Sequence, residues 1–158
     1  MHYKKGFTLV ELVIVIALMG IMVAVATPRF ANGDIFETRG DAGLISSTLR
    51  YAQKTAIAQR RQVFVITDTV AQPNSIKLCF VSDPNCPVAQ AVIDPETDGP
   101  YVMTLSRNVR INPSNNSLGF DGLGQAVPNG AANYVVTNQK NNAQTFTVNI
   151  EADTGYIR

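Results

Sequence analysis

Two cysteines are the side chains of this sequence best suited to covalent chemistry. Cys79 and Cys86 are separated by six residues, and in an oxidising compartment we expect them to form a disulfide. The bond would close the loop 80–85 and contribute about 2.5 kcal/mol by the chain-entropy estimate for so short a loop. Free thiols are the alternative. A zinc site is not expected, because the cysteines lack companion ligands and the only histidine is His2.

Catalytic sets that need histidine cannot form beyond residue 2, because no histidine follows it. The sequence also lacks a Walker loop and a dinucleotide-binding fingerprint, and no pair of carboxylates is singled out for hydrolysis. Acidic residues alternate between Asp94 and Gly99 as in the first half of an EF-hand loop, but Leu105 stands where the bidentate glutamate is required. We interpret this segment as a solvated acidic turn. The sequence therefore predicts no enzyme activity, no metal and no cofactor.

The N-terminal segment carries the strongest pattern in the chain. Residues 1–6 are short and basic, and over residues 7–27 the only charged side chain is Glu11. These 21 residues would span about 31 Å as a helix, which matches the hydrocarbon thickness of a bilayer. Lys4 and Lys5 place the N-terminus in the cytoplasm by the positive-inside rule. We therefore expect a membrane-spanning helix with the rest of the chain on the far side.

Three interpretations compete for this segment. A secretory signal cut after Ala26 fits the small residues there, but the apolar stretch exceeds the usual length of about 7–15 residues and contains Glu11. Pro28 also lies unfavourably close to that cleavage point. A plain signal anchor explains the length and the lysines but not Glu11, since a carboxylate costs about 2.5–3.5 kcal/mol at the centre of a spanning helix. A residue retained at that cost usually has a partner.

The third interpretation rests on the fixed order of basic residues, glycine, phenylalanine and glutamate before the span. These residues are Lys4-Lys5-Gly6-Phe7-Thr8-Leu9-Val10-Glu11. The segment resembles the prepilin peptidase site of type IV pilins and type II secretion pseudopilins, and the resemblance continues to Pro28. It implies cleavage between Gly6 and Phe7, usually with N-methylation of the new Phe7 terminus. Residues 1–6 would then be a leader peptide, and Glu11 would be the fifth mature residue.

The resemblance also implies an assembly role for Glu11 and Pro28. In a bundle of such helices, the Glu11 carboxylate can neutralise the amino group of Phe7 on the next subunit, because an unpaired charge is costly in an apolar setting. The pair would fix the axial register of neighbouring helices, as a buried polar residue does in a coiled coil. Pro28 resembles the pilin proline that accompanies a kink or local melting in the filament. Alternatively, Pro28 ends the spanning helix.

A second, amphipathic helix is expected after the span. Apolar residues recur at spacings of three and four, which predicts a helix over residues 35–62, nearly continuous with the first helix. The residues of this stripe are Ala42, Ile45, Leu49, Ala52 and Ala56. Polar residues on the opposite face are expected to be solvated or to contact other subunits. They are Arg39, Asp41, Ser47, Arg50, Lys54 and Arg61.

After residue 62 the pattern changes to short strands separated by turn residues. The expected strands cover residues 63–67, 75–81, 101–105, 109–111, 117–120, 134–137, 145–150 and 155–158. An antiparallel sheet packed on the helix gives an α+β fold. The predicted domains are the leader 1–6, the transmembrane helix 7–27, its amphipathic continuation 28–62 and a β-rich head over residues 63–158.

Two segments of the head carry a second resemblance. Residues 117–124 look like a strand followed by a glycine turn, and residues 148–158 look like a closing hairpin, as in minor pilins and pseudopilins of the GspH/FimT type. This resemblance implies the pilin fold, with a long N-terminal helix packed on an antiparallel sheet. Arg29-Phe30 and residues 49–54 are similar to minor pilins of the mannose-sensitive haemagglutinin class.

The resemblance implies a structural function, that of a minor pilin or pseudopilin that joins or initiates a type IV pilus or a type II secretion pseudopilus. Its implied partners are prepilin peptidase, other pilin subunits, an inner-membrane assembly platform and, before assembly, membrane lipid. The expected location is the inner membrane, with the head in the periplasm, and then the filament, which can reach the cell surface.

Two other functions stay open. One is a minor pilin that captures DNA, and the other is a surface enzyme on a signal anchor, for which an intact leader would be the sign. Without Lys4 and Lys5, the 13 basic residues fall to 11 against 12 acidic ones, so no global field attracts nucleic acid. DNA-capturing members carry basic residues at the closing hairpin, where this chain has Tyr156 and Arg158. Nucleic acid is therefore not an expected partner.

Overall fold

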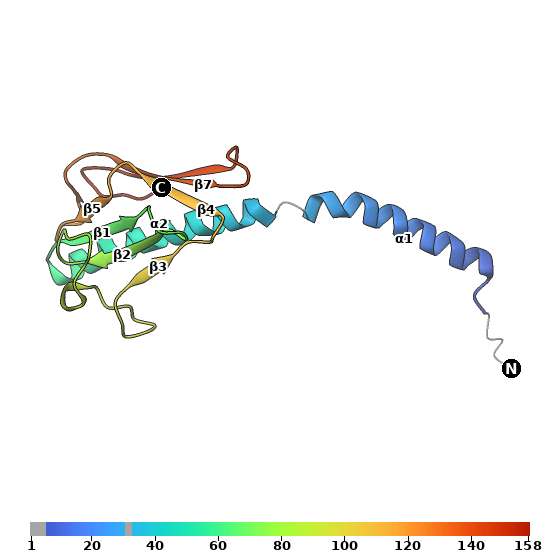
Figure 1. The fold of residues 1–158 in the computed structure, drawn as a ribbon, viewed down its shortest axis with the longest axis horizontal. Coiled ribbons are helices and arrows are strands. Elements are labelled where there is room, and N and C mark those ends of the chain that lie inside the picture. The colour runs from blue at the N-terminus through green and yellow to red at the C-terminus, as the bar shows by residue number, and fades with distance from the viewer. Residues whose placement is uncertain (1–5, 31–32) are drawn as a thin grey trace. The chain divides into compact units, whose positions relative to one another are not determined.

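The computed structural model describes residues 6–30 and 33–158, with the backbone alone for residues 27–30. The chain divides into two compact units, Met1–Gly33 and Asp34–Arg158. Each unit is a separate body, and Figure 1 follows the chain through both.

The first unit is a single apolar helix in its described part. α1 (Leu9–Phe30) has 22 residues, and its stretch Leu9–Ala26 is long and apolar enough to cross a membrane. The helix runs two residues past Pro28, so the proline does not end it. This is physically reasonable, because proline breaks a helical hydrogen bond to the preceding turn but can be accommodated at the cost of a bend.

The helix of the second unit follows the predicted apolar stripe. α2 (Gly33–Gln59) has 27 residues, and all five residues of that stripe are buried. It ends three residues before the predicted boundary, because Arg60 adopts a positive φ of 50°. The Arg61 N–H then donates to the Ala56 carbonyl at 3.2 Å. This left-handed closing turn satisfies a terminal carbonyl and stops the helix.

The sequence predicts Asp41 on the solvated face of α2, but the structure buries it. It is 5% exposed, and its carboxylate accepts hydrogen bonds from the Ser106 N–H at 2.9 Å and the Ser106 hydroxyl at 3.2 Å. Thr38 and Thr48 are buried on the same helix. The buried face is therefore wider than the apolar residues alone indicate, and the polar groups on it are tolerated because they are hydrogen-bonded.

Two antiparallel sheets complete the described head. The first has the order β3-β2-β1-β5-β6. Its strands are β1 (Val63–Asp68), β2 (Ser75–Cys79), β3 (Val102–Thr104), β5 (Ser117–Phe120) and β6 (Ala126–Val127). The second has the order β4-β7-β8, with β4 (Val109–Pro113), β7 (Ala132–Asn138) and β8 (Thr145–Ile150). A short 3-10 helix, η1 (Val88–Gln90), lies between β2 and β3.

The strands agree with the sequence prediction except at two places. β6 was not predicted, and residues 155–158 form an isolated bridge between Ile157 and Ile150 in place of a strand. The bridge is short because Gly155 turns the chain with a φ of +62° directly before it. Between β6 and β7, residues 128–131 form an exposed loop.

The core of the head draws on α2 and both sheets, which lie along the helix in Figure 1. Tyr134 and Phe120 are its largest fully buried side chains. Burial raises the pKa of the Tyr134 phenol, and the Thr67 hydroxyl opposes this shift only in part. The buried hydrophobic residues of the described chain all lie between Ala42 and Ile157. The head therefore has a complete core of its own and can fold without α1.

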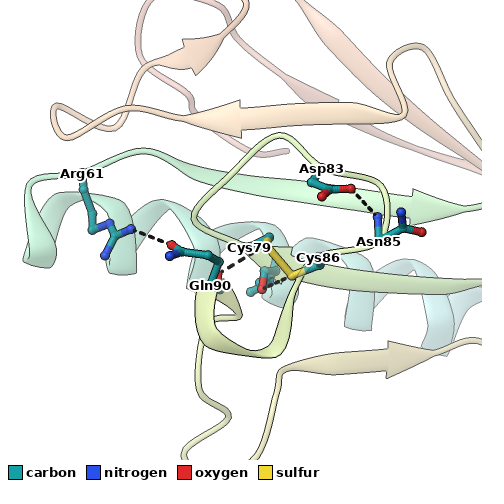
Figure 2. Close-up of a disulfide and its surroundings, with 7 residues drawn as sticks. Arg61, Cys79, Asp83, Asn85, Cys86 and Gln90 are labelled. Atoms are coloured by element: carbon teal, nitrogen blue, oxygen red, sulfur yellow. Dashed lines mark hydrogen bonds between the residues drawn. A yellow bond between two sulfur atoms is a disulfide. The ribbon is translucent and has the colours of Figure 1, made fainter.

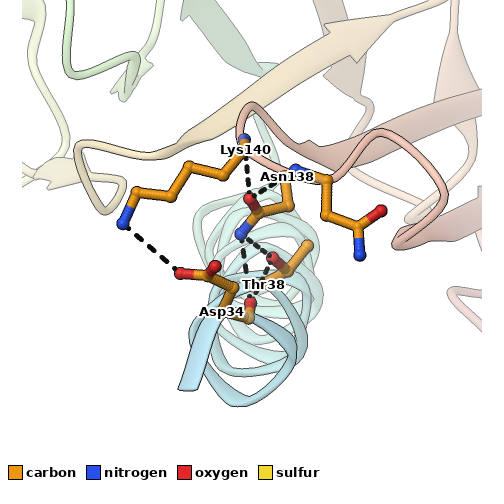
Figure 3. A network of polar contacts seen from close by, with 5 residues as sticks. Asp34, Thr38, Asn138 and Lys140 are labelled. Atoms are coloured by element: carbon orange, nitrogen blue, oxygen red, sulfur yellow. Dashed lines mark hydrogen bonds and ion pairs between the residues drawn. The ribbon is translucent and has the colours of Figure 1, made fainter. Parts of the chain in front are cut away.

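The first turn of α2 is fastened to the turn that follows β7 (Figure 3). Asn138 is fully buried, and its Nδ2 donates to the Asp34 carbonyl at 3.1 Å and to Thr38 Oγ1 at 3.0 Å. Its Oδ1 accepts from the backbone N–H groups of Lys140 and Asn141. Lys140 Nζ also lies 3.5 Å from Asp34 Oδ1. One amide side chain thus shapes the turn and holds the helix start.

Candidate functional site

The predicted cleavage point lies in an open segment. Gly6, Phe7 and Thr8 precede α1 without helical structure, and all three are exposed. A Cβ atom at Gly6 would meet no atom within 4 Å. The Gly6–Phe7 peptide bond is therefore accessible to a protease in the isolated chain. Lys4 and Lys5 lie outside the described residues.

Thr8 and Glu11 form a capping box at the start of α1. The Thr8 N–H and hydroxyl donate to Glu11 Oε2 at 3.1 and 3.0 Å, and the Glu11 N–H donates to Thr8 Oγ1 at 3.2 Å. This reciprocal pair satisfies N–H groups that the first helical turn leaves free. The sequence prediction for Glu11 names only a partner on another subunit. It misses the local partner Thr8, although the Thr-x-x-Glu spacing is the signal for a capping box.

α1 exposes its apolar surface along its length. The large hydrophobic side chains from Leu9 to Val25 are exposed, and a shallow apolar groove is lined by Ile21, Met22, Val25 and Ala26. An apolar surface of this extent requires lipid or other helices to cover it. Gly6, Phe7 and Glu11 lie together at the first end of this helix, whereas Pro28 lies near its last residue.

The two cysteines lie in the head and are joined to each other (Figure 2). The disulfide links Cys79, the last residue of β2, to Cys86, as predicted. The enclosed loop is shaped by Asp83, whose carboxylate accepts the Asn85 N–H at 2.9 Å. Cys79 Sγ lies 3.3 Å from the Gln90 carbonyl oxygen. The bond fastens an irregular loop to the edge of the core, which is a structural role.

The two segments that carry the second resemblance meet at Gln53 of α2. Gln53 Nε2 donates to the carbonyls of Gly124 at 2.8 Å and of Thr154 and Gly155 at 3.1 Å. Gly124 has a φ of +87° and Gly155 a φ of +62°, so both turns use the left-handed region that favours glycine. One helix side chain thereby joins the glycine turn to the closing turn. No local sequence signal marks Gln53, because its partners are 71 to 102 residues away.

In the acidic turn, the Asp94 carboxylate binds groups of the turn itself. Asp94 accepts the Glu96 N–H at 3.0 Å and the Thr97 hydroxyl at 3.3 Å, and the Asp98 N–H donates to the Asp94 carbonyl. Among the residues that the structure describes, no group of three or more His, Cys, Asp or Glu side chains is arranged to hold a metal ion.

Comparison with known proteins defines the class of the chain. Residues 1–27 match the prokaryotic N-terminal methylation motif, and the head combines a helix with antiparallel sheets. The chain therefore carries the N-terminal motif of type IV pilins and has the pilin fold, as the sequence predicts.

Among curated proteins, the chain is similar to several type IV pilins. It is 35% identical over 69 residues to the type IV narrow pilus major component PilA5 of Thermus thermophilus, covering 44% of this chain and 60% of that protein. It is 40% identical over 62 residues to a fimbrial protein of Moraxella nonliquefaciens, covering 39% of this chain and 38% of that protein. The chain thus spans less than two thirds of the length of these relatives.

Solved structures resemble the chain over more of its length. The type IV minor pilin FimU of Pseudomonas aeruginosa superposes with a TM-score of 0.58 at 15% identity, covering 77% of this chain and 87% of that one. The minor pseudopilin EpsH of Vibrio cholerae superposes with a TM-score of 0.58 at 12% identity, covering 77% and 94%. At these identities the likeness establishes the fold.

Proposed function

We propose that this chain is a minor pilin or pseudopilin, a subunit that assembles into, or initiates, a type IV pilus or a type II secretion pseudopilus. The observation that carries the proposal is the combination of a methylation motif over residues 1–27 with a head that shares the fold of the minor pilin FimU and the minor pseudopilin EpsH. The mannose-sensitive haemagglutinin class stays a prediction from sequence.

In this proposal, the residues at the start of α1 act in sequence. Prepilin peptidase cuts between Gly6 and Phe7, and the new Phe7 amino group becomes a cation at the end of an apolar helix. Glu11 Oε2 is held by Thr8, while Oε1 has no hydrogen-bond partner among the described residues. Oε1 can therefore accept the Phe7 amine of the next subunit. An uncompensated charge in this apolar setting is costly, so the pair favours a single register.

The proposal also assigns each part of the chain to a place. Residues 1–6 are the leader, residues 7–27 span the inner membrane, residues 28–62 lead into the head and contain α2, which ends at Gln59, and residues 63–158 form the β-rich part of the head. Before assembly, lipid covers the exposed surface of α1, and the head lies in the periplasm. During assembly, an inner-membrane platform transfers α1 from lipid to the helices of neighbouring subunits, which cover the same surface.

Substitution of Glu11 tests the proposal. Glu11→Gln removes the charge but can keep the capping box, because glutamine also serves at this position. Processing should remain normal, as seen by mass spectrometry of a mature N-terminus at methylated Phe7. Incorporation into sheared filaments should fall by about tenfold or more, since each lost charge pair of this kind is worth more than about 1.4 kcal/mol.

The matched control is Thr8→Val, which removes the Thr8 hydroxyl from the capping box and leaves the Glu11 charge. This variant should assemble, because the Glu11 charge is intact and the backbone N–H of residue 8 can still donate to Glu11 Oε2. Two results would overturn the proposed register pair. They are normal incorporation of Glu11→Gln, and loss of incorporation in Thr8→Val while Glu11→Gln is incorporated normally. Either result would show that Glu11 acts only at the start of its own helix.

DNA capture is the alternative function. Arg50 reaches the closing turn, where its Nη2 donates to the Ile157 carbonyl at 3.2 Å, next to the exposed Arg158. The alternative requires salt-dependent DNA binding by the head that Arg158→Ala abolishes. Absence of such binding at low salt would leave the structural function alone.

A further inference from the structure

A cavity of about 370 Å³ lies in the head between α2 and the acidic turn. The acidic turn comprises residues 94–99, and a bridge between Ile93 and Pro100 closes it. Pockets for drug-sized ligands begin at about 300 Å³, so this cavity can admit one long side chain or a small molecule. Among the described residues, no lysine, arginine or histidine lines it. The charged groups that line it are therefore acidic.

Two tyrosines form an aromatic wall of the cavity. Tyr51 of α2 and Tyr101 both line it, and their rings stack with the centroids 5.3 Å apart and an interplanar angle of 25°. The Tyr51 hydroxyl donates to the Ile93 carbonyl at 3.1 Å. The Tyr101 hydroxyl lies 3.0 Å from Thr48 Oγ1. These hydrogen bonds hold the rings in place, and the face of an aromatic ring attracts a cation placed against it.

Glu96 supplies the free carboxylate of the cavity. Asp94 also lines it, but both oxygens of Asp94 are engaged within the turn, one by the Glu96 N–H at 3.0 Å and the other by the Thr97 hydroxyl at 3.3 Å. The Glu96 carboxylate has neither a hydrogen bond nor an ion pair among the described residues. An unpaired acceptor and a fixed aromatic wall therefore line the same cavity.

Apolar side chains complete the lining. Pro95 of the acidic turn and Val102 and Met103 of β3 line the cavity. A ligand with an apolar stem and a cationic end can pack its stem against such side chains and leave its charge near the carboxylate. A bound metal ion would instead need several oxygen ligands, and Glu96 is the one free carboxylate that the described residues place here. The lining therefore suits an organic cation.

We propose that this cavity binds the side chain of an arginine that belongs to a different subunit of the filament. A planar guanidinium can stack on a tyrosine ring and can donate two parallel hydrogen bonds to one carboxylate, here that of Glu96. A lysine ammonium lacks this planar fork and is more strongly hydrated. The source of the arginine rests on the proposed function, because a minor subunit has other subunits as its neighbours.

NMR titration of residues 34–158 with N-acetyl-L-arginine amide tests the chemistry of the cavity. The probe should shift the ring signals of Tyr51 and Tyr101, and its side-chain methylenes should show NOEs to these rings. N-acetyl-L-citrulline amide has nearly the same shape without the charge. It should bind at least about fivefold more weakly, because it loses both the cation–π attraction and the charge pair. Equal binding of the two probes would overturn the proposal.

Two matched substitutions in the acidic turn test the role of Glu96. Glu96→Gln should weaken binding of the arginine probe at least about threefold, because the charge pair is lost. Asp98→Asn should have little effect, because Asp98 carries the same charge but does not line the cavity. Asparagine also tolerates the positive φ of 54° at this position. Unchanged binding by Glu96→Gln, or equal weakening by both variants, would overturn the proposed site.

Photo-cross-linking in cells tests the source of the arginine. A photoreactive amino acid in place of Val102 should link the chain to a different processed pilin, through a peptide that contains an arginine, and Glu96→Gln in the same chain should reduce this product at least about threefold. The same amino acid in place of Val70, which is 92% exposed and does not line the cavity, is the control.

Three results would overturn the proposal. They are an equal product from the Val70 position, a product from the Val102 position only with a second copy of the chain, and a product from the Val102 position only with a protein outside the filament. Processing at Phe7 and recovery in filaments are scored separately, so the proposed function can stand if the arginine site fails.

Discussion

The two carboxylate oxygens of Glu11 differ in their surroundings. Oε2 accepts both donors of Thr8 at 3.1 and 3.0 Å, which orients the side chain at the very start of α1. A carboxylate held in one orientation loses less conformational freedom when a second group binds it. At the scale of single residues, the capping box therefore prepares Glu11 for the proposed intermolecular pair.

Gly6→Val should block processing without changing the fold. A Cβ atom at Gly6 meets no atom within 4 Å, so any effect must arise where the peptidase approaches the backbone. Mass spectrometry of the purified variant should find residues 1–6 still attached. Gly20→Ala is the matched control, because this exposed glycine of α1 has equally open surroundings. A normally cleaved Gly6→Val variant would contradict the role of Gly6.

Residues marked by local pattern could be predicted, and residues defined by distant partners could not. Cys79 and Cys86 are close in sequence, and the apolar stripe of α2 follows from helical periodicity. Gln53 and Asn138 look like ordinary polar residues, because the atoms that they bind are 71 and 104 positions away. Asp41 was assigned to solvent for the same reason, since its partner Ser106 lies 65 positions away.

At the scale of elements, the two glycine turns behave as one unit. Gly155 approaches the Gly124 carbonyl so closely that a Cβ atom at Gly155 would lie 2.0 Å from that oxygen. The φ of +62° at Gly155 is also unfavourable for any other L-residue. The closing turn can therefore reach Gln53 only with glycine at this position.

Gly155→Ala should destabilise the head by at least about 2 kcal/mol, because the left-handed conformation and the clash with Gly124 both oppose it. Urea unfolding of residues 34–158 measures the change. Gly130→Ala in the β6–β7 loop is the control and should change the free energy of unfolding by less than about 0.5 kcal/mol. Equal effects of the two substitutions would rule out the joined turns as the cause.

Asn138→Ala should release the start of α2 from the turn after β7. The substitution removes the amide that donates to Thr38 Oγ1 and leaves two turn N–H groups without their acceptor, which should cost about 2–3 kcal/mol. Hydrogen exchange should rise in the first turn of α2 before other parts of the head. Asn142→Ala, at an exposed position of the same loop, should leave exchange unchanged, and a rise there as well would contradict the assignment.

The elements themselves were mostly predictable, and their ends were not. Alternating burial in β2, β4 and β8 follows the apolar pattern. The end of α2 depends on the left-handed turn at Arg60, a conformation that a sequence rich in helix formers does not indicate. β6 is two residues long and pairs with β5 through a turn that only the tertiary fold defines.

At the scale of the whole molecule, the head and the apolar helix are separate bodies. The change from an uninterrupted apolar segment to a mixed sequence is visible without a structure. The consequence for experiments is practical. Residues 34–158 hold the complete described core, so head stability can be measured in water without the exposed apolar helix α1.

The stability of the head should fall in acid through Asp68. Its carboxylate accepts the N–H groups of Ala71 and Val70 at 3.1 and 3.0 Å, which hold the pKa of Asp68 below its ordinary value of 3.8. A group whose pKa is lowered by folding stabilises the protein above its unfolded pKa, and the stabilisation is lost as pH falls through the folded pKa.

Thermal unfolding of the head between pH 7 and pH 2 measures this effect. Asp68→Asn keeps an acceptor for the turn but cannot titrate, so its melting temperature should depend less on pH below 3.8 than that of the unchanged head. Identical pH profiles for the two proteins would exclude Asp68 as a source of the acid sensitivity.

The exposed loop between β6 and β7 offers a further use of this head. Residues 128–131 are all exposed, and short insertions are tolerated best at exposed loop tips whose backbone makes few contacts. A small epitope or fluorophore-binding peptide placed at Gly130 would leave α1 and the buried core of the head untouched. Individual copies of the chain could then be counted in living cells.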